Sequence, residues 1–493
     1  RRKMKKVLTY LLAVVLGVAC CFTFIGCGKD EDRDITPQIN EGQNMTATEL
    51  LEKAKTESGN FVAYGNTSRI TTAMSNFIAS DYGKALGLTS SNAMAQKQND
   101  SAIYKLLENE KSTPGGSDNA SMVLIQDSAS LMLYRNSTNL LANYVPKDMK
   151  DKVDENNQLP LAHQFINKLF MYNVKDANNT LKFTNVWELT DTKYKNNIYF
   201  KNPNNEQVNK NFLIMLTKED WSAKLEAAYK KLHNNAAAED VGSGKAYKNY
   251  GYKWVAEFLK NCNFSINSDT TIAQDLSKDT NAGKMGLFVL SKLRDASVKG
   301  ENLQVSAWDK KAGSDTEFET IEPFAGFMYS IYAQLCTYGP RPYTAMLFVN
   351  YLMTEEGFTP WKSLGGYSSN KDVPVYEGSI TTPVMIGDKQ VYLDNNGEKM
   401  FQTGKDGDNK VYTYIEDDGT LKSQTIKEGD KITVDGKEKD FKASVATKEV
   451  TTVKDSPLSF WNQTLVVEDG NYINTAIADH VDDWINQQIS QKS

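Results

Sequence analysis

Residues 61–80 read FVAYGNTSRITTAMSNFIAS, and this stretch decides the fold class. The apolar run 61–64 predicts a buried strand, because a short continuous apolar run before a turn is typical of strands covered on both faces. A polar turn follows at 65–68, and the apolar spacing after it predicts a helix from about Arg69 to Ser80. A strand, a polar turn and a helix in this order form an α/β unit.

The same order recurs farther along the chain. Residues 122–125 (MVLI) run into QDSAS at 126–130, and residues 285–290 (MGLFVL) run into Ser291 and Lys292. Helical patterns at 221–232 and 252–259 lie between these strands, so we expect most of residues 57–375 to form a parallel or mixed sheet covered by helices. Ligands of such sheets bind at the carboxyl ends of the strands, beside helix N-termini.

Two further segments have distinct patterns. Apolar residues at 345, 348, 349 and 352 predict a helix with a buried stripe that ends at Gly357. From 378 to 453, short alternating runs are separated by Asn-Gly, Asp-Gly and similar turns, which predicts a β-rich insertion of hairpins. A final helix is expected at about 472–489.

The first 27 residues combine a basic start with an apolar run from Val7 to Ile25 and end in Gly26-Cys27. A membrane-spanning helix needs about 20 apolar residues and a retained flank, so this segment is more typical of a secretory signal. We expect it to be a lipoprotein signal, with Cys27 carrying the lipid that anchors the protein to a membrane. The alternative is a plain anchor or cleaved signal in which Cys27 is incidental.

Composition limits the remaining possibilities. Without residues 1–26, which hold five basic residues and no acidic ones, 51 Lys and Arg face 62 Asp and Glu, a net charge of −11 that argues against nucleic acid as a partner. The length predicts two or three domains. Cys262 and Cys336 are either separate buried thiols or one disulfide. Three scattered histidines disfavour a histidine-rich metal site, and we expect no metal and no cofactor.

Enzyme motifs are weak in this sequence. Ser117-Asp118-Asn119 and Ser368 to Lys371 resemble elements of penicillin-binding enzymes, but they occur in reverse order and without a following Lys-Thr-Gly. Residues 242–245 (GSGK) lack the earlier glycine and the Ser/Thr of a phosphate-binding loop, so they are interpreted as a surface turn. We therefore predict that the chain is not an enzyme.

Four runs resemble the solute-binding proteins of bacterial ABC importers, in the two-lobed group that includes ferric-ion, polyamine and sugar-phosphate binders. They are residues 61–69, 185–191 (NVWELTD), 283–288 (GKMGLF) and 344–361, of which the last is the most specific. The resemblance implies an α/β fold of the type II periplasmic-binding-protein kind with a β-rich insertion near the C-terminus. Its lobes would be residues 57–155 with 322–377, and residues 156–321 with 454–493, closing on a ligand between them.

The resemblance also implies which residues bind the ligand. The first lobe would contribute residues from its first strand, from the turn after that strand and from the end of its next strand. The second lobe would contribute residues at the end of the strand before residue 291, and two tyrosines on the returning strand would form the floor of the site. The residues are Tyr64, Asn66, Thr67, Ser68, Arg69, Asp127, Ser128, Ser291, Lys292, Tyr329 and Tyr332. The competing interpretations are that Thr67 or Ser68 only caps the following helix, that Arg69 is a surface charge, and that the tyrosines belong to the core.

Ferric-ion members of that group hold iron with paired tyrosines where this chain has Ser291 and Lys292. A lysine there disfavours Fe³⁺, so a small organic or phosphorylated solute is expected. The sequence thus predicts a monomeric, lipid-anchored receptor on the extracytoplasmic face of the cell membrane that delivers a solute to an ABC permease. The alternatives are an enzyme on the same two-lobed fold, a ferric-ion binder, and an adhesin that uses the insertion.

Overall fold

A computed structural model describes residues 34–492 except 113–118, 137, 176–181, 296, 306–320, 388, 408, 416–420 and 435–436. The predicted lipid site Cys27 and the rest of the signal therefore lie outside the described residues. Ile35 to Ser493 form one compact unit. No helix among the described residues has both the length and the apolar character needed to cross a membrane.

A central sheet of parallel and antiparallel strands organises this unit, as the alternation of strand and helix patterns predicts. Its strands follow the order β2-β1-β3-β10-β5-β8-β6-β7, with β4 and β23 paired to β10 and with β9 and β11 paired to β5. The strands are β1 Phe61–Gly65, β2 Ala93–Lys97, β3 Ala120–Ile125, β4 Leu141–Ala142, β5 Ala162–Asn173, β6 Ile198–Tyr199, β7 Cys262–Asn263, β8 Met285–Val289, β9 Leu303–Val305, β10 Gly326–Cys336, β11 Gly366–Ser368 and β23 Val466–Val467. The mixed α/β class is confirmed.

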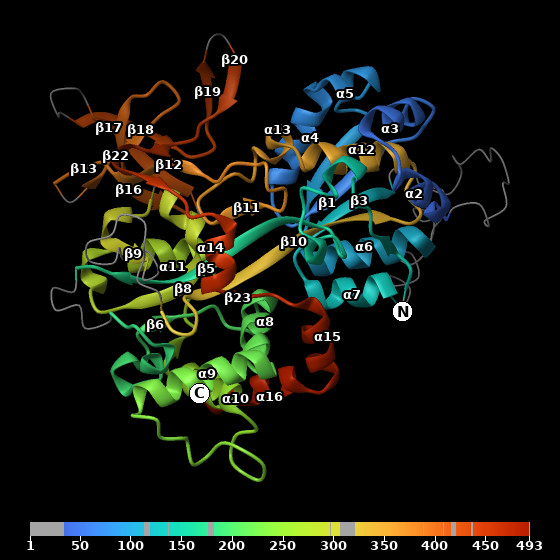
Figure 1. The fold of residues 1–493 in the computed structure, drawn as a ribbon. Helices are drawn as coiled ribbons and strands as arrows, with labels where there is room; N and C mark the ends of the chain where they lie inside the picture. Colours follow the sequence, from blue (N-terminus) through green and yellow to red (C-terminus); the bar gives the residue numbers. More distant parts are fainter. Residues whose placement is uncertain are drawn as a thin grey trace, which may run out of the picture. The chain divides into compact units, whose positions relative to one another are not determined.

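Two long antiparallel strands, β5 and β10, lie side by side in the middle of the sheet (Figure 1). Parallel β1, β2 and β3 attach to the C-terminal part of β10, whereas β8 attaches to the C-terminal part of β5. We call β1, β2 and β3 with their helices half one, and β6, β7 and β8 with theirs half two. Because β5 and β10 are buried along their whole length, the two halves share one continuous core across them.

The helices of half one cover the sheet with apolar stripes. In α4, the buried residues Ile70, Ala73, Met74 and Phe77 repeat at the helical spacing that the sequence shows. The helices are α2 Thr36–Gly42, α3 Ala47–Ala54, α4 Arg69–Ala79, α5 Asp81–Ala85, α6 Asp100–Ser112, α7 Ser128–Asn136, α12 Pro342–Leu352 and α13 Glu355–Phe358.

The predicted helix that ends at Gly357 differs in two respects. It breaks after Leu352, and the separate turn α13 begins where the Thr354 hydroxyl caps the Gly357 amide. In addition, α12 is buried almost all round rather than along one stripe, because Phe348 packs on Phe61 and Phe77 while other elements cover its remaining faces.

Half two and the C-terminal segment are also helical, and the predicted helices at 221–232 and 252–259 are confirmed. The helices are α8 Gln207–Leu216, α9 Glu219–Leu232, α10 Tyr250–Asn261, α11 Asp269–Leu276, α14 Leu458–Thr464, α15 Gly470–Ala478 and α16 Val481–Gln491. Short 3₁₀ turns lie at η2 Lys147–Met149, η3 Glu155–Asn157, η4 Val186–Thr190, η5 Thr192–Tyr194, η6 Asp279–Asn281, η7 Leu290–Arg294 and η8 Gly300–Asn302. The single final helix expected at 472–489 is two helices, because His480 adopts a left-handed backbone (φ 62°) between them.

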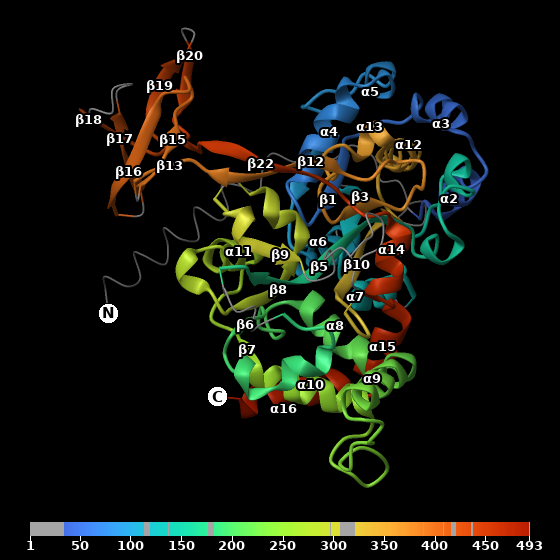
Figure 2. The same ribbon diagram turned by 60° about the vertical axis from the view of Figure 1, so that its left-hand side comes forward.

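The insertion is β-rich, as predicted. Figure 2 shows β12 and β22 leading from the central sheet to its other strands. They are β12 Glu377–Pro383, β13 Met385–Ile386, β14 Lys389–Gln390, β15 Tyr392–Leu393, β16 Lys399–Asp406, β17 Asn409–Ile415, β18 Leu421–Lys427, β19 Lys431–Val434, β20 Lys437–Asp440, β21 Ser444–Val445 and β22 Thr447–Lys454. Two small clusters, one around Met400 and Tyr412 and one around Val391 and Phe401, form cores separate from the main one.

Cys262 and Cys336 are separate buried thiols. Burial raises the pKa of both thiols well above the ordinary value, so both stay protonated near neutral pH.

Candidate ligand-binding site

The turn between β1 and α4 brings a basic residue to the edge of half one. Ser68 occupies the N-cap position of α4, but its side chain makes no capping hydrogen bond, so helix capping does not explain this residue. Nδ2 of Asn66 is buried without a hydrogen-bond partner within the described part of the chain. Tyr64 is occupied differently, since its hydroxyl donates to Oε1 of Glu110 at 3.0 Å.

Arg69, the first residue of α4, is half-buried and faces residues from outside its own half. Burial and, to a smaller extent, Arg294 of half two lower the pKa of its guanidinium while Tyr329 of β10 raises it, and the result is a pKa of about 10. Arg69 is therefore a partly desolvated cation near a second cation, Arg294.

The opposite side of the site is η7, which follows β8 directly. Ser291 is buried and Lys292 is half-buried. Burial lowers the pKa of Lys292, and Arg294 and Arg69 lower it as well, whereas Asp269 and Asp295 raise it. Arg69 of half one thus lies near enough to Lys292 to lower its pKa.

These three basic side chains form what we call the cation cluster: Arg69, Lys292 and Arg294. No ion pair to any of them is formed among the residues that the structure describes. Arg69 and Lys292 are half-buried, and burial is the first cause that lowers their pKa values; Arg294 lies at the exposed edge of the cluster, and partial burial lowers its pKa as well. An anion in this position would reverse that effect, since an opposite charge stabilises the charged form of a base.

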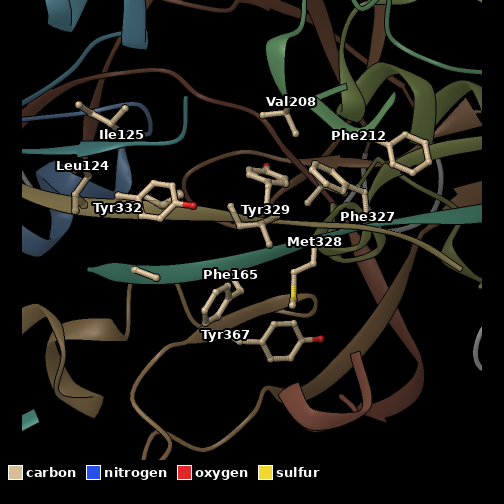
Figure 3. Close-up of a cluster of buried hydrophobic side chains, with 14 of the residues drawn as sticks. Leu124, Ile125, Phe165, Val208, Phe212, Phe327, Met328, Tyr329, Tyr332 and Tyr367 are labelled. Carbon is tan, nitrogen blue, oxygen red and sulfur yellow. The ribbon is translucent and has the colours of Figure 1, made fainter. Parts of the chain in front are cut away.

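Tyr329 lies on the strand that connects the two halves. Figure 3 shows Phe327 and Tyr329 on one side of β10 and Met328 on the other, with Val208 of α8 on the Tyr329 side. Tyr329 is 6% exposed, and burial raises the pKa of its hydroxyl well above the ordinary value; Asp269 also raises it and Arg69 lowers it. The side chain is thus mostly core, with its hydroxyl in the electrostatic field of the site.

A buried ion network supports the half-two side of the site. Lys168 of β5 is 1% exposed, and its Nζ atom lies 2.6 Å from Oδ1 of Asn209 and 3.8 Å from Oδ1 of Asp269. Lys201 contacts the other oxygen of Asp269 at 3.1 Å and also pairs with Glu206. Burial alone would raise the pKa of Asp269, but the two lysines outweigh it and hold that pKa below the ordinary value.

The strand end after β3 is partly structural. Both carboxylate oxygens of Asp127 accept hydrogen bonds from Ser130, at 3.1 Å from its amide and 2.6 Å from its hydroxyl, so this aspartate caps α7. Asp100, at the start of α6, accepts from the amides of Gln126 and Asp127. Burial raises the pKa of Asp100 to about 7, and Asp127 and Glu206 of half two add to that shift.

Ser128 and Tyr332 are grouped around a cavity of about 370 Å³. Phe165 and Ser330 of the crossing strands and Glu468 of the C-terminal segment line it as well. The predicted residues are therefore divided between two places: Arg69, Ser291, Lys292 and Tyr329 lie at the cation cluster, whereas Ser128 and Tyr332 lie at this cavity.

Sequence reasoning missed Lys168 and Asp269. Lys168 had a detectable signal, a lone charge within the apolar run 165–172 (FINKLFMY). Asp269 had no such signal in the sequence, because the helix dipole alone explains an acidic residue that follows a capping serine at the start of a helix. Among the described residues, no group of three His, Cys, Asp or Glu side chains is arranged to hold a metal ion.

Comparisons with known proteins found similarity among solved structures. No protein family matches the sequence, and no curated protein does. Similar solved structures include a ferric binding protein from Campylobacter jejuni (13% identity, TM-score 0.46, 64% of this chain and 88% of that chain). FutA of Trichodesmium, in complex with iron and citrate, is 14% identical with a TM-score of 0.45, over 64% of this chain and 89% of that chain. The periplasmic binding protein AfuA of Actinobacillus pleuropneumoniae, with fructose-6-phosphate bound, is 15% identical with a TM-score of 0.43, over 65% of this chain and 88% of that chain.

At identities of 13–15% and TM-scores below 0.5, the similarities do not establish what this chain binds.

Proposed function

We propose that this chain is a solute-binding protein of an ABC importer that captures a small anionic solute, organic or phosphorylated, between half one and half two. The observation that carries the proposal is the cation cluster, in which Arg69 of half one lowers the pKa of Lys292 of half two and Arg294 of half two lowers the pKa of Arg69. A ligand that contacts both halves at once is what makes closure favourable in a two-lobed protein.

The charge of the cluster favours an anion over a metal cation. Arg69, Lys292 and Arg294 are positive, while the neighbouring Asp269 is already held by Lys168 and Lys201. A trivalent metal ion would be repelled at this position. An anion would instead gain charge-assisted hydrogen bonds from groups that have no ion-pair partner among the described residues.

The finer parts of the proposal rest on residues 1–27 and on the resemblance. The basic start, apolar run and Cys27 support a lipid anchor on the extracytoplasmic face of the membrane. Delivery to a permease, a monomeric state and the lobe boundaries 57–155 with 322–377 and 156–321 with 454–493 follow from the resemblance. In this proposal the two lobes correspond to half one and half two.

A thermal-shift screen tests the proposal, with sugar phosphates, carboxylates, amino acids, polyamines and metal ions as separate classes. We expect an anionic class to raise the melting temperature of the wild type. Arg69→Ala should weaken that binding roughly tenfold to a hundredfold, because a hydrogen bond to a charged group contributes about 1.5–3 kcal/mol. The unliganded melting temperature should stay nearly unchanged.

Arg135→Ala is the matched control, since Arg135 lies on α7 of the same half and is not among the groups that affect Lys292. Equal weakening by both variants, or a large loss of unliganded stability in Arg69→Ala, would contradict the assigned role of Arg69. Turnover of a compound in the screen would favour the alternative function, an enzyme on the same fold.

A further inference from the structure

The cavity around Ser128 and Tyr332 is walled by several parts of the chain. Helix α7 of half one contributes Ser128, and the crossing strands β5 and β10 contribute Phe165 and Tyr332. The C-terminal segment contributes Glu468, whose Oε1 atom accepts a hydrogen bond of 2.8 Å from Nδ2 of Asn211 in half two. We call this space the Glu468 cavity. Its volume of about 370 Å³ lies within the range of about 300–1,000 Å³ that is usual for small-molecule sites.

Two buried side chains of this lining keep a polar atom unused. Oε2 of Glu468 and Oγ of Ser128 form no hydrogen bond within the described part of the chain. Glu468 is 9% exposed and Ser128 is 1% exposed, so bulk solvent does not serve them either. A buried polar atom without a partner costs free energy, and most such atoms in native proteins have one. A hydrogen-bond donor brought in by a ligand would satisfy both oxygens.

Gly470 brings Ser128 close to the segment that carries Glu468. A Cβ atom added at Gly470 would lie 3.0 Å from Cβ of Ser128 and 3.5 Å from its Oγ. Gly470 itself lines the Glu468 cavity and follows Glu468 by two residues. The lack of a side chain at Gly470 thus lets the hydroxyl of Ser128 and the carboxyl of Glu468 belong to the same wall, where one donor group can serve both.

The charges of the lining favour a cation. Among the described residues that line the Glu468 cavity none is basic, and the two charged ones are Glu468 and Asp469. Asp469 is already compensated, because its Oδ2 lies 2.9 Å from Nζ of Lys218 and its Oδ1 accepts from the amides of Asn471 and Tyr472. Glu468 forms no ion pair within the described residues. A cation would compensate its carboxylate, whereas an anion would be repelled.

The apolar part of the lining favours an organic cation over a metal ion. Its residues are Met132, Leu159, Pro160, Phe165 and Val467. Leu159 is 64% exposed, which makes it one of the few large apolar side chains that the described chain presents to solvent. An alkyl or aryl group would bury apolar surface against this wall, whereas a hydrated metal ion would not. The described residues also hold no group of three metal-binding side chains.

We propose that the Glu468 cavity binds a small organic ammonium ion, which donates hydrogen bonds to Oε2 of Glu468 and Oγ of Ser128 and lays its apolar body against Phe165. An ammonium group carries several donors, and its hydrogen bonds to a carboxylate are about twice as strong as those between neutral groups. This ligand is separate from the anionic solute of the proposed function, since the described lining of the cavity contains no member of the cation cluster.

The test is calorimetric titration of the full chain with butylammonium and with phenethylammonium. The comparison compounds are butanol and phenethyl alcohol, which have the same shape without the charge, and butyrate, which has the opposite charge. The titrations are made at about pH 8.5, because burial raises the pKa of the Glu468 carboxyl to about 8 and an alkyl ammonium keeps its proton there. We expect at least one ammonium ion to bind about tenfold or more tightly than its alcohol, and butyrate not to bind.

Three variants locate the binding. Glu468→Gln keeps an oxygen for Asn211 but removes the charge, so it should weaken ammonium binding about tenfold to a hundredfold. Its unliganded melting temperature should not fall, because no ion pair among the described residues is lost. Ser128→Ala removes a neutral acceptor and should weaken binding about twofold to tenfold. The matched control is Asp455→Asn, which changes a buried carboxyl that does not line the cavity and should keep the wild-type affinity.

Three results would overturn the inference: no binding of either ammonium ion, equal binding of an ammonium ion and its alcohol, or the same ammonium affinity in Glu468→Gln as in the wild type. The outcome is also distinct from that of the proposed function. If an anionic class binds in the screen and no ammonium ion does, this inference fails and the receptor proposal stands. If ammonium binding depends on Glu468 and no anionic class binds, the cavity's role stands and the proposed function fails.

Discussion

At the scale of single residues, the site depends on charges that the fold places out of water. Lys168 sits in the middle of a fully buried strand, and Asp269 and Asn209 are what make its charge tolerable there. Burial lowers the pKa of Lys168, and Asp269 raises it. The network therefore fixes the half-two side of the site while leaving Lys292 without an ion pair among the described residues.

Removing Asp269 should be strongly destabilising. In Asp269→Ala the buried Lys168 ammonium loses its carboxylate, and leaving one charge of a buried pair uncompensated costs about 3–5 kcal/mol. Urea unfolding would measure the loss. The control is Asp372→Ala, which removes an exposed partner of Lys152 and should change stability little, because an ion pair between exposed side chains contributes little. Similar losses in the two variants would show that the network is not structural.

Asp100 should make stability depend on pH. Its folded-state pKa of about 7 is above the ordinary value of 3.8, so the native protein binds more protons between these two pH values. The contribution of Asp100 to the free energy of unfolding is complete below about pH 4. It decreases as the pH rises toward 7, by at most about 1.4 kcal/mol per pH unit. The unfolding free energy of Asp100→Asn, measured from pH 4 to 8, should fall less steeply than that of the wild type; parallel curves would contradict this.

How far the sequence predicts the site differs from residue to residue. Arg69 and Lys292 were identifiable because strand ends of an α/β sheet gather at one edge, and Arg69 lowers the pKa of Lys292. Asp127 satisfied the same rule, but its oxygens are used by Ser130. A rule based on position cannot tell a ligand-binding side chain from a helix cap, because both need an oxygen at a helix start.

At the scale of elements, the insertion is a separate structure on the chain. Its clusters around Met400 and Val391 have their own cores, and β12 and β22 run antiparallel from Glu377 paired with Lys454 to Pro383 paired with Thr447. The pair Pro383 and Thr447 is therefore a natural place to close a shorter hairpin.

Excising the insertion should leave the rest of the protein folded. Replacing residues 384–446 by Asn-Gly keeps β12 and β22 and closes them with a hairpin turn. We expect the unfolding free energy to change by about 1 kcal/mol, since shortening a long connection has a small entropic effect. Denaturant unfolding and solute binding would test this. A loss of cooperative unfolding would mean that the main core depends on the insertion.

Element boundaries were less predictable than element types. The apolar pattern at 472–489 continues through His480, so periodicity alone predicts one helix, while the left-handed backbone at that residue makes two. Likewise, Thr354 starts a new turn inside a pattern that otherwise continues to Gly357. In both places a local backbone conformation overrides a side-chain pattern that extends past it.

At the scale of the whole molecule, the sheet order explains why distant segments share one site. The strand β10 returns antiparallel to β5 and pairs with β3, so the strand end before Arg69 and the strand end before Lys292 meet over the same crossing strands. The C-terminal segment adds a second connection between the halves, because α15 packs against α7 while Tyr472 of α15 shares a hydrogen bond with Thr217 at the end of α8. Neither meeting is visible in spacing along the chain.

The most direct test of the central claim is the pKa of Lys292, measured by NMR on methylated lysines with the signal assigned through Lys292→Arg. If Arg69 and Lys292 face each other from opposite halves, Arg69→Ala should move the pKa of Lys292 upward, because a neighbouring positive charge is removed. Arg135→Ala should leave it unchanged. An unaltered Lys292 pKa in Arg69→Ala would contradict the shared site.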